Sequence, residues 1–296
     1  MLLMLLVVTS TAAQAQSVGS FYALSTSQRP AATAGAPVRA NATEAPFYIK
    51  AYGFYSLLTP GTQINYDLSQ AQSSLPNSFK ATKTSLGAGP RAGLGVGFIV
   101  SDFINVGIDA DMLFGSAIKT NTNVFSGSGT TFSNYNIHST TTLRVLSIIP
   151  NVTFKALSRP SFYIYNRLGL IGGVVLDYKA VAQTVETSSK GAVTTSENTS
   201  KYTKNSLATG YQAALGVQFR LSQTIRAFAE IVAYNQSFKP REVQSTGSST
   251  SNGKTTVSSF TSSYKDQGDS KNADEFPSIN VAINSVGVGA GLSFRF

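Results

Sequence analysis

The feature that most constrains this chain is a strict alternation of residues between Val286 and Phe296. Every second residue in this stretch is apolar, and the residues between them are Gly, Ser or Arg. Successive side chains of a β-strand point to opposite faces, so the pattern predicts a strand with one apolar face. A soluble protein rarely leaves so apolar a strand at an unpaired edge. In a membrane β-barrel, by contrast, the apolar face meets lipid and the last strand closes the sheet.

The composition favours the same class of fold. Charged residues make up 12% of the chain, which is about half the share found in a typical soluble domain. The sequence has no run of about 18 apolar residues and therefore predicts no transmembrane helix. A barrel accommodates both facts, because its apolar residues fall on alternate positions of many short strands.

Eight segments between residues 46 and 296 alternate in this way. Short connections follow the second, fourth and sixth segments, and long connections rich in Ser, Thr, Asn and Gly follow the first, third, fifth and seventh. This asymmetry is typical of outer-membrane barrels, with short periplasmic turns and long external loops. We therefore expect an all-β, eight-stranded, antiparallel up-and-down transmembrane β-barrel in a bacterial outer membrane, with both termini periplasmic. We expect the loops 184–206 and 244–263 to be mobile and low in complexity, and not packed caps. The segments are 47–57, 86–100, 103–117, 140–156, 162–178, 207–220, 225–238 and 284–296.

The first 45 residues do not alternate. Residues 1–15 form a short apolar stretch that ends in Ala13-Gln14-Ala15, which predicts a signal peptide cleaved after Ala15. Residues 16–45 are rich in Ala, Ser, Thr and Pro, so we expect a flexible segment. The chain has no cysteine, which excludes disulfides and thiolate metal sites.

A soluble β-sandwich or lipocalin-like barrel is the alternative fold. It would bury the apolar face and expose the charged one. The glycines argue against it, because Gly93, Gly95, Gly97 and Gly216 share the face of the charged residues. Solvent-facing strand positions usually carry Thr, Lys or Glu. Inside a narrow barrel, glycine makes room for Arg and Tyr side chains that reach across, so the membrane barrel is favoured.

Eleven charged residues are predicted to point into the lumen, the space that the strands enclose. Buried charges are costly unless they are paired, so we expect a network of ion pairs. An eight-stranded barrel is just wide enough for side chains to fill, which favours a structural plug over a narrow, anion-tolerant path. The residues are Lys50, Arg91, Asp109, Asp111, Arg144, Lys155, Arg167, Arg220, Arg226, Glu230 and Arg295.

From about Phe47 to Phe296 the chain resembles small bacterial outer-membrane β-barrels such as the OmpA transmembrane domain, OmpX and OmpW. The last strand is similar to the signal that the barrel-assembly machinery reads, with Gly289, Leu292, Phe294 and Phe296 in the matching places. The resemblance implies three partners: outer-membrane lipid, that machinery and periplasmic chaperones. Tryptophan is absent, so Tyr and Phe must form the aromatic girdles.

Pro90 and Pro150 lie inside predicted strands. Proline cannot donate a hydrogen bond to the sheet, and the apolar residues change phase around Pro150, so we expect a β-bulge there. The resemblance to OmpW implies a perturbed wall through which an apolar solute could leave sideways. Bulges without such a route are the favoured interpretation, since bulges are common at barrel rims.

Enzyme chemistry finds little support in the sequence. His138, the one histidine, precedes Ser139, but no acidic residue lies between Lys119 and Arg159 to orient it. We expect no catalytic residues, no metal, no cofactor and, because basic residues do not cluster, no nucleic acid. The expected function is a structural or surface-interaction role with an unidentified extracellular ligand. The alternative is a narrow channel or transporter for small or apolar solutes.

Overall fold

A computed structural model describes residues 46–68, 78–128, 130–159, 161–266 and 274–296. The predicted signal peptide and the predicted flexible segment lie outside this part of the chain. The described residues form an all-β structure of sixteen strands, and most neighbouring strands run antiparallel. No helix in the described ranges is long and apolar enough to span a membrane.

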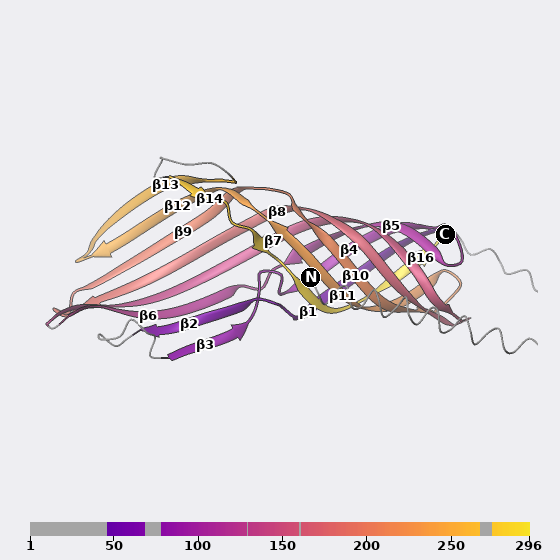
Figure 1. Cartoon of the computed structure of the whole chain (residues 1–296), viewed down its shortest axis with the longest axis horizontal. Helices are drawn as coiled ribbons and strands as arrows, with labels where there is room; N and C mark the ends of the chain where they lie inside the picture. Colours follow the sequence, from indigo (N-terminus) through magenta and orange to yellow (C-terminus); the bar gives the residue numbers. More distant parts are fainter. Residues whose placement is uncertain (1–45, 69–77, 129, 160, 267–273) are drawn as a thin grey trace, which may run out of the picture. The chain divides into compact units, whose positions relative to one another are not determined.

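Eight of the strands close into a ring, in which each strand pairs antiparallel with two neighbours (Figure 1). These ring strands correspond to the eight segments that the sequence predicts. In order around the ring they are β1 (Phe47–Leu58), β4 (Pro90–Ile99), β5 (Ile104–Phe114), β7 (Thr131–Ser158), β8 (Phe162–Ser188), β10 (Ala208–Arg220), β11 (Ile225–Phe238) and β16 (Ser285–Arg295).

The alternating strand at the end of the sequence closes this ring. β16 pairs with β1 on one side, where Tyr48 lies opposite Arg295, and with β11 on the other. The backbone N–H of Phe296 donates to the carbonyl of Phe47 at 3.0 Å. The strand therefore has no free edge along the ring, as the sequence predicts.

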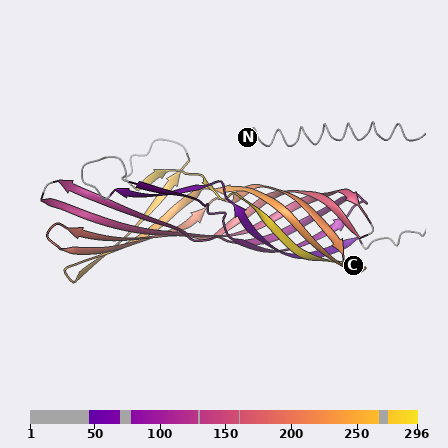
Figure 2. The same cartoon turned by 90° about the horizontal axis from the view of Figure 1, so that it is seen from below.

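The predicted long loops are largely β-structure. They form an open sheet, here called the outer sheet, whose order is β3-β2-β6-β7-β8-β9-β12-β13-β14 and which uses residues 131–142 of β7 and 179–188 of β8. Figures 1 and 2 both show its hairpins at the end of the ring opposite the C-terminus. Its other strands are β2 (Thr62–Leu68), β3 (Ser78–Lys83), β6 (Ile118–Ser128), β9 (Val193–Asn205), β12 (Pro240–Ser251), β13 (Lys254–Lys265) and β14 (Glu275–Pro277), while the short β15 (Val281–Ala282) pairs with β11.

Residues 184–206 and 244–263, which the sequence predicts to be loops, therefore lie mostly in paired strands. Polar side chains join the strands across the outer sheet: the Thr194 hydroxyl donates to Ser251 at 3.2 Å and the Ser196 hydroxyl to Ser249 at 3.1 Å. The β12–β13 hairpin turns at Asn252-Gly253, where both residues have positive φ angles. This is the geometry of a type I′ turn, which matches the twist of the two strands.

Along the ring strands, burial alternates in the sense opposite to that of a soluble protein. Leu94 and Leu170 are 63% and 70% exposed on the outer face, whereas Arg91 and Asp109 on the inner face are 1% and 0% exposed.

Phenylalanines gather on the outer face at the short-turn end, which is the end of the ring that carries the short connections between strands. With a rise of ~3.3 Å per residue and a tilt of ~40° from the ring axis, the part of β1 from Phe47 to Leu57 spans about 25 Å along that axis. The exposed phenylalanines at this end are Phe47, Phe98, Phe103, Phe154, Phe219, Phe294 and Phe296.

The two prolines do not shift the register of their strands. Pro90 is the first residue of β4, a position that tolerates proline. Pro150 lies opposite Ile108 in an uninterrupted register with β5, so the predicted bulge there was wrong. Pairing of β7 with β8 pauses at Ile149 and Pro150 and resumes in the same register. A register shift occurs instead between Arg144 and Val145.

Candidate functional site in the lumen

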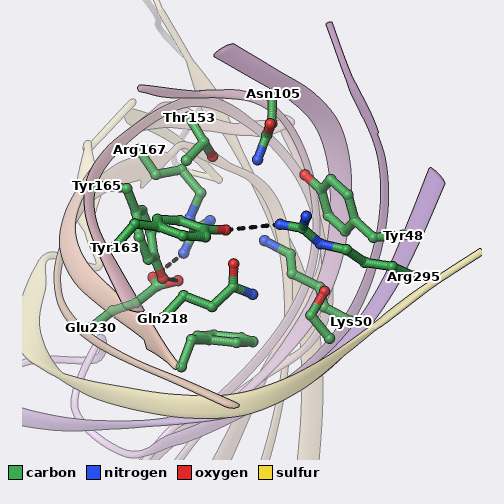
Figure 3. Close-up of a pocket in the computed structure, with 12 residues that line it drawn as sticks. Tyr48, Lys50, Asn105, Thr153, Tyr163, Tyr165, Arg167, Gln218, Glu230 and Arg295 are labelled. Carbon is green, nitrogen blue, oxygen red and sulfur yellow. Dashed lines mark hydrogen bonds and ion pairs between the residues drawn. The ribbon is translucent and has the colours of Figure 1, made fainter. Parts of the chain in front are cut away.

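A network of buried ion pairs crosses the lumen and joins four ring strands. Figure 3 shows three of its members, Lys50, Arg167 and Glu230. Asp109 on β5 binds the Lys50 ammonium of β1 and the Arg167 guanidinium of β8, both at 2.8 Å. Arg167 also forms an ion pair with Glu230 on β11. The Tyr165 hydroxyl donates to Glu230 at 2.7 Å. Because each charge has an opposite partner, the network offsets part of the desolvation cost of these charges.

A second ion pair lies closer to the outer sheet. Arg91 on β4 binds Asp111 on β5 at 3.1 Å, and both side chains are fully buried. The Tyr234 hydroxyl donates to the other Asp111 oxygen, also at 3.1 Å. The Arg91 guanidinium also lies over the Tyr234 ring, 4.1 Å from its centroid, which adds a cation–π contact.

Apolar side chains fill the lumen between the ion pairs and the outer sheet. One cluster packs around the Arg91–Asp111 pair, and the other lies at the ring end that joins the outer sheet. Leu143, Val145 and Ile149 belong to these clusters. The first contains Phe54, Ile149, Ile171, Ala214, Val232 and Tyr234. The second contains Leu113, Leu143, Val145, Tyr178, Ala208, Phe238 and Ile283.

At the short-turn end, cationic groups gather around Tyr163. The Arg295 guanidinium donates to the Tyr163 hydroxyl at 3.2 Å. The Lys155 ammonium lies 5.2 Å from the centroid of the same ring, and the Arg226 guanidinium lies 6.0 Å from it. A cavity of about 30 Å³ lies between this group and the Asp109 network.

Inward glycines make room for these large side chains, as the sequence predicts. A Cβ atom on Gly216 would lie 2.5 Å from Tyr165 Cζ, and one on Gly95 would lie 2.7 Å from Lys50 Cε. Such distances are far below van der Waals contact. Glycine at these positions is therefore a packing requirement of the filled lumen.

The structure brings most of the predicted lumen charges together. Lys155 is half-buried, and two arginines lie elsewhere. Arg144 is exposed because it lies on the outward parity of β7, between the buried residues Leu143 and Val145. Arg220 is exposed at the start of a short turn, where its Nε donates to the Ser222 carbonyl at 3.4 Å. The buried charges are Lys50, Arg91, Asp109, Asp111, Arg167, Arg226, Glu230 and Arg295.

Sequence reasoning missed the polar partners of these charges. Tyr163, Tyr165 and Tyr234 bind lumen charges, and Asn105 and Gln218 line the cavity. All five share the inward parity of the predicted charges on their strands. That parity was the signal that could have identified them.

The other residues that the sequence singles out are the assembly-signal residues and His138. In the assembly-signal strand, Leu292, Phe294 and Phe296 face outward, and Gly289 lies between Phe54 and Glu230 of the neighbouring strands. His138 is exposed on the outer sheet, opposite Asn121 and Gln183. Within the described ranges, no group of three or more His, Asp or Glu side chains is placed to hold a metal.

No protein-family model and no curated protein matches the sequence. Similar solved structures include the outer membrane protein AlkL in lipid bilayers, with 10% identity over 91% of this chain and 95% of that chain and a TM-score of 0.33. Ail, the attachment invasion locus protein of Yersinia pestis, has 13% identity over 86% and 99%, with a TM-score of 0.27. The outer membrane protease OmpT from Escherichia coli has 8% identity over 85% and 94%, with a TM-score of 0.24.

The inverted burial of the ring is characteristic of one class of fold. Apolar side chains cover the outer face, whereas the charges are enclosed and paired, which is the arrangement of a barrel surrounded by lipid. The ring therefore has the arrangement typical of an outer-membrane β-barrel.

Proposed function

We propose that the ring strands are an eight-stranded transmembrane barrel with a plugged lumen, and that the protein serves as a structural scaffold that presents the outer sheet at the cell surface. The observation that carries this proposal is the network of Lys50, Asp109, Arg167 and Glu230, which ties four strands together across the lumen. Two apolar clusters lie between it and the outer sheet. Solvated ions have no apparent passage through packed apolar side chains.

In the proposed orientation the short turns face the periplasm and the outer sheet faces outward. The location of the Ser/Thr-rich hairpins at one end of the ring supports this orientation, since outer-membrane barrels carry their longer connections outside. The proposed partners are the surrounding lipid and, during biogenesis, the assembly machinery and periplasmic chaperones. Outward-facing Leu292, Phe294 and Phe296 are accessible for such recognition.

A narrow channel or transporter is the second candidate. The cavity beside the Asp109 network favours it, because the cavity is polar and lies within the lumen. Reconstitution into planar lipid bilayers separates the two functions. A plugged scaffold gives no discrete conductance steps, in the wild type or in Arg220→Gln, which removes an exposed charge. Steps in the wild type that change size in Arg167→Gln but not in Arg220→Gln would refute the scaffold.

A further inference from the structure

Three cationic side chains lie on the outer face where the ring strands continue into the outer sheet. They are Arg144 on β7, Lys179 on β8 and Lys201 on β9, here called the cationic row, and their strands lie side by side (Figure 1). Leu143 and Tyr178 are buried in the second apolar cluster. Arg144 and Lys179 follow them in the chain and therefore point to the opposite face. Lys201 lies directly opposite Lys179 and shares its face.

The register places the cationic row within reach of one ligand. Side chains directly opposite each other in an antiparallel pair, such as Lys179 and Lys201, have Cβ atoms about 5 Å apart. Arg144 lies opposite Asp177, two residues before Lys179, and this diagonal separates Arg144 and Lys179 by roughly 7–8 Å. Like charges in such positions repel each other. An anion that lies against the row would remove this repulsion.

The carboxylates near the cationic row do not neutralise it. Asp177 is exposed in part and adds one negative charge. Glu242 on β12 already binds the Lys204 ammonium at 2.6 Å. Within the residues that the structure describes, no ion pair involves a member of the row. Its three cations and Asp177 leave a local charge of +2, which matches a phosphomonoester with a charge of about −1.5 to −2 near pH 7.

The cationic row begins where the lipid-facing band of the ring ends. Leu146 on β7 and Leu176 on β8 are exposed apolar residues at the top of this band. Arg144 lies two residues beyond Leu146, and Lys179 lies three residues beyond Leu176. Three residues of a strand with a tilt of ~40° rise about 8 Å. The polar headgroup region extends about that far beyond the hydrocarbon core of a bilayer.

We propose that Arg144, Lys179 and Lys201 bind the phosphomonoester headgroup of an anionic lipid in the outer leaflet. The lysines supply point charges, and Arg144 supplies a planar fork of donors that matches phosphate oxygens. The acyl chains of the same lipid lie along exposed apolar side chains such as Leu176. This inference rests on the proposed transmembrane barrel, because that proposal sets the level of the headgroups.

The test measures lipid binding by the full-length protein refolded in neutral detergent micelles, with dioctanoyl phosphatidic acid as the probe and native mass spectrometry as the readout. Dioctanoyl phosphatidylglycerol, a phosphodiester with less charge, should bind several-fold more weakly. Lys179→Gln combined with Lys201→Gln should weaken binding of phosphatidic acid roughly tenfold or more. Lys190→Gln combined with Lys254→Gln makes the same change in net charge beside the tips of two hairpins and should bind as the wild type does.

Three results would overturn the site. The first is equal affinity for the two lipids, and the second is an equal loss of affinity in the two double variants. The third is displacement of phosphatidic acid by inorganic phosphate at matched concentration, which would assign the row to a free ion and not to a lipid.

Urea unfolding in vesicles separates this inference from the proposed function and from a folding defect. In phosphatidylcholine, the variant with both Lys179→Gln and Lys201→Gln should have a midpoint no lower than that of the wild type, because it lacks the like-charge pair. A lower midpoint would assign the lysines to the fold and overturn the site. Adding phosphatidic acid should raise the midpoint of the wild type only. A wild type that inserts but gains no stability would overturn the headgroup site alone, whereas failure to insert would overturn the proposed barrel.

Discussion

Replacing Asp109 with asparagine would remove the charge on which the lumen network converges and change the side-chain volume very little. Asp109 is 0% exposed and holds both Lys50 and Arg167 at 2.8 Å. The variant leaves Lys50 beside a neutral acceptor, while Arg167 keeps only Glu230 as a carboxylate partner. Removing one partner of a buried ion pair costs about 3–5 kcal/mol, because the other charge stays buried without compensation. We therefore expect the free energy of unfolding to fall by about that amount.

Urea unfolding in detergent micelles or lipid vesicles, followed by tryptophan-independent probes such as far-UV circular dichroism, measures this change. With a slope of about 2 kcal/mol per molar urea, the midpoint should fall by about 2 M. Adding Lys50→Met to Asp109→Asn removes one uncompensated cation, so the double variant should be more stable than the sum of the single effects predicts.

Glu242→Gln provides the matched control. Glu242 accepts from the exposed Lys204 ammonium at 2.6 Å on the outer sheet, so its loss should leave the urea midpoint unchanged. A loss below about 1 kcal/mol in Asp109→Asn would refute the reasoning, because it would mean that water, and not the paired side chains, compensates the lumen charges.

Two more predictions concern packing and pH. Gly216→Ala should destabilise the barrel by about 1–3 kcal/mol in the same urea assay, because the new Cβ meets the Tyr165 ring. Gly172→Ala is the control. Its Cβ meets no atom within 4 Å, so this variant should leave stability nearly unchanged. On the outer sheet, hydrogen bonds from Lys239 and Arg241 lower the pKa of Asp266 from 3.8 to about 2. Because the folded pKa is the lower one, the stabilising contact is complete above pH ~4 and is lost as the pH falls through about 2. A ¹³C carboxyl titration should show that midpoint and a higher one in Arg241→Gln; identical midpoints would contradict the assigned contact.

The ring could be predicted because apolar residues recur at every second position along most of its strands. A lipid-facing position accepts almost only apolar residues, and the opposite face accepts Gly, Tyr or charge, so alternation such as that of Val286 to Phe296 marks each strand. The same rule failed for Leu143, Val145 and Ile149. These residues are apolar but line the lumen, since the interior of this barrel contains apolar clusters as well as charges. Their inward packing accounts for the apparent change of phase around Pro150.

The outer sheet could not be found by hydrophobic period, because Ser and Thr occupy both of its faces. Its pairing relies on backbone hydrogen bonds and on hydroxyl contacts such as that between Ser196 and Ser249. One sequence signal was present. Asn252-Gly253 stands between two stretches rich in Ser and Thr, and an Asn-Gly pair is a strong signal for a hairpin turn. The ion-pair partners in the lumen, by contrast, depend on distances across the ring that no local pattern encodes.

β7 and β8 continue without interruption from the lipid-facing wall into the outer sheet, and this continuity has a practical consequence. From Asp177 to Ser188, β8 extends about 35 Å beyond the register shift, at ~3.3 Å per residue. The hairpin turns near Gly191, where a Cβ would meet no atom within 4 Å. A foreign epitope grafted at this turn would stand at the tip of the β8–β9 hairpin, which β7 and β12 flank on either side and hold within the outer sheet.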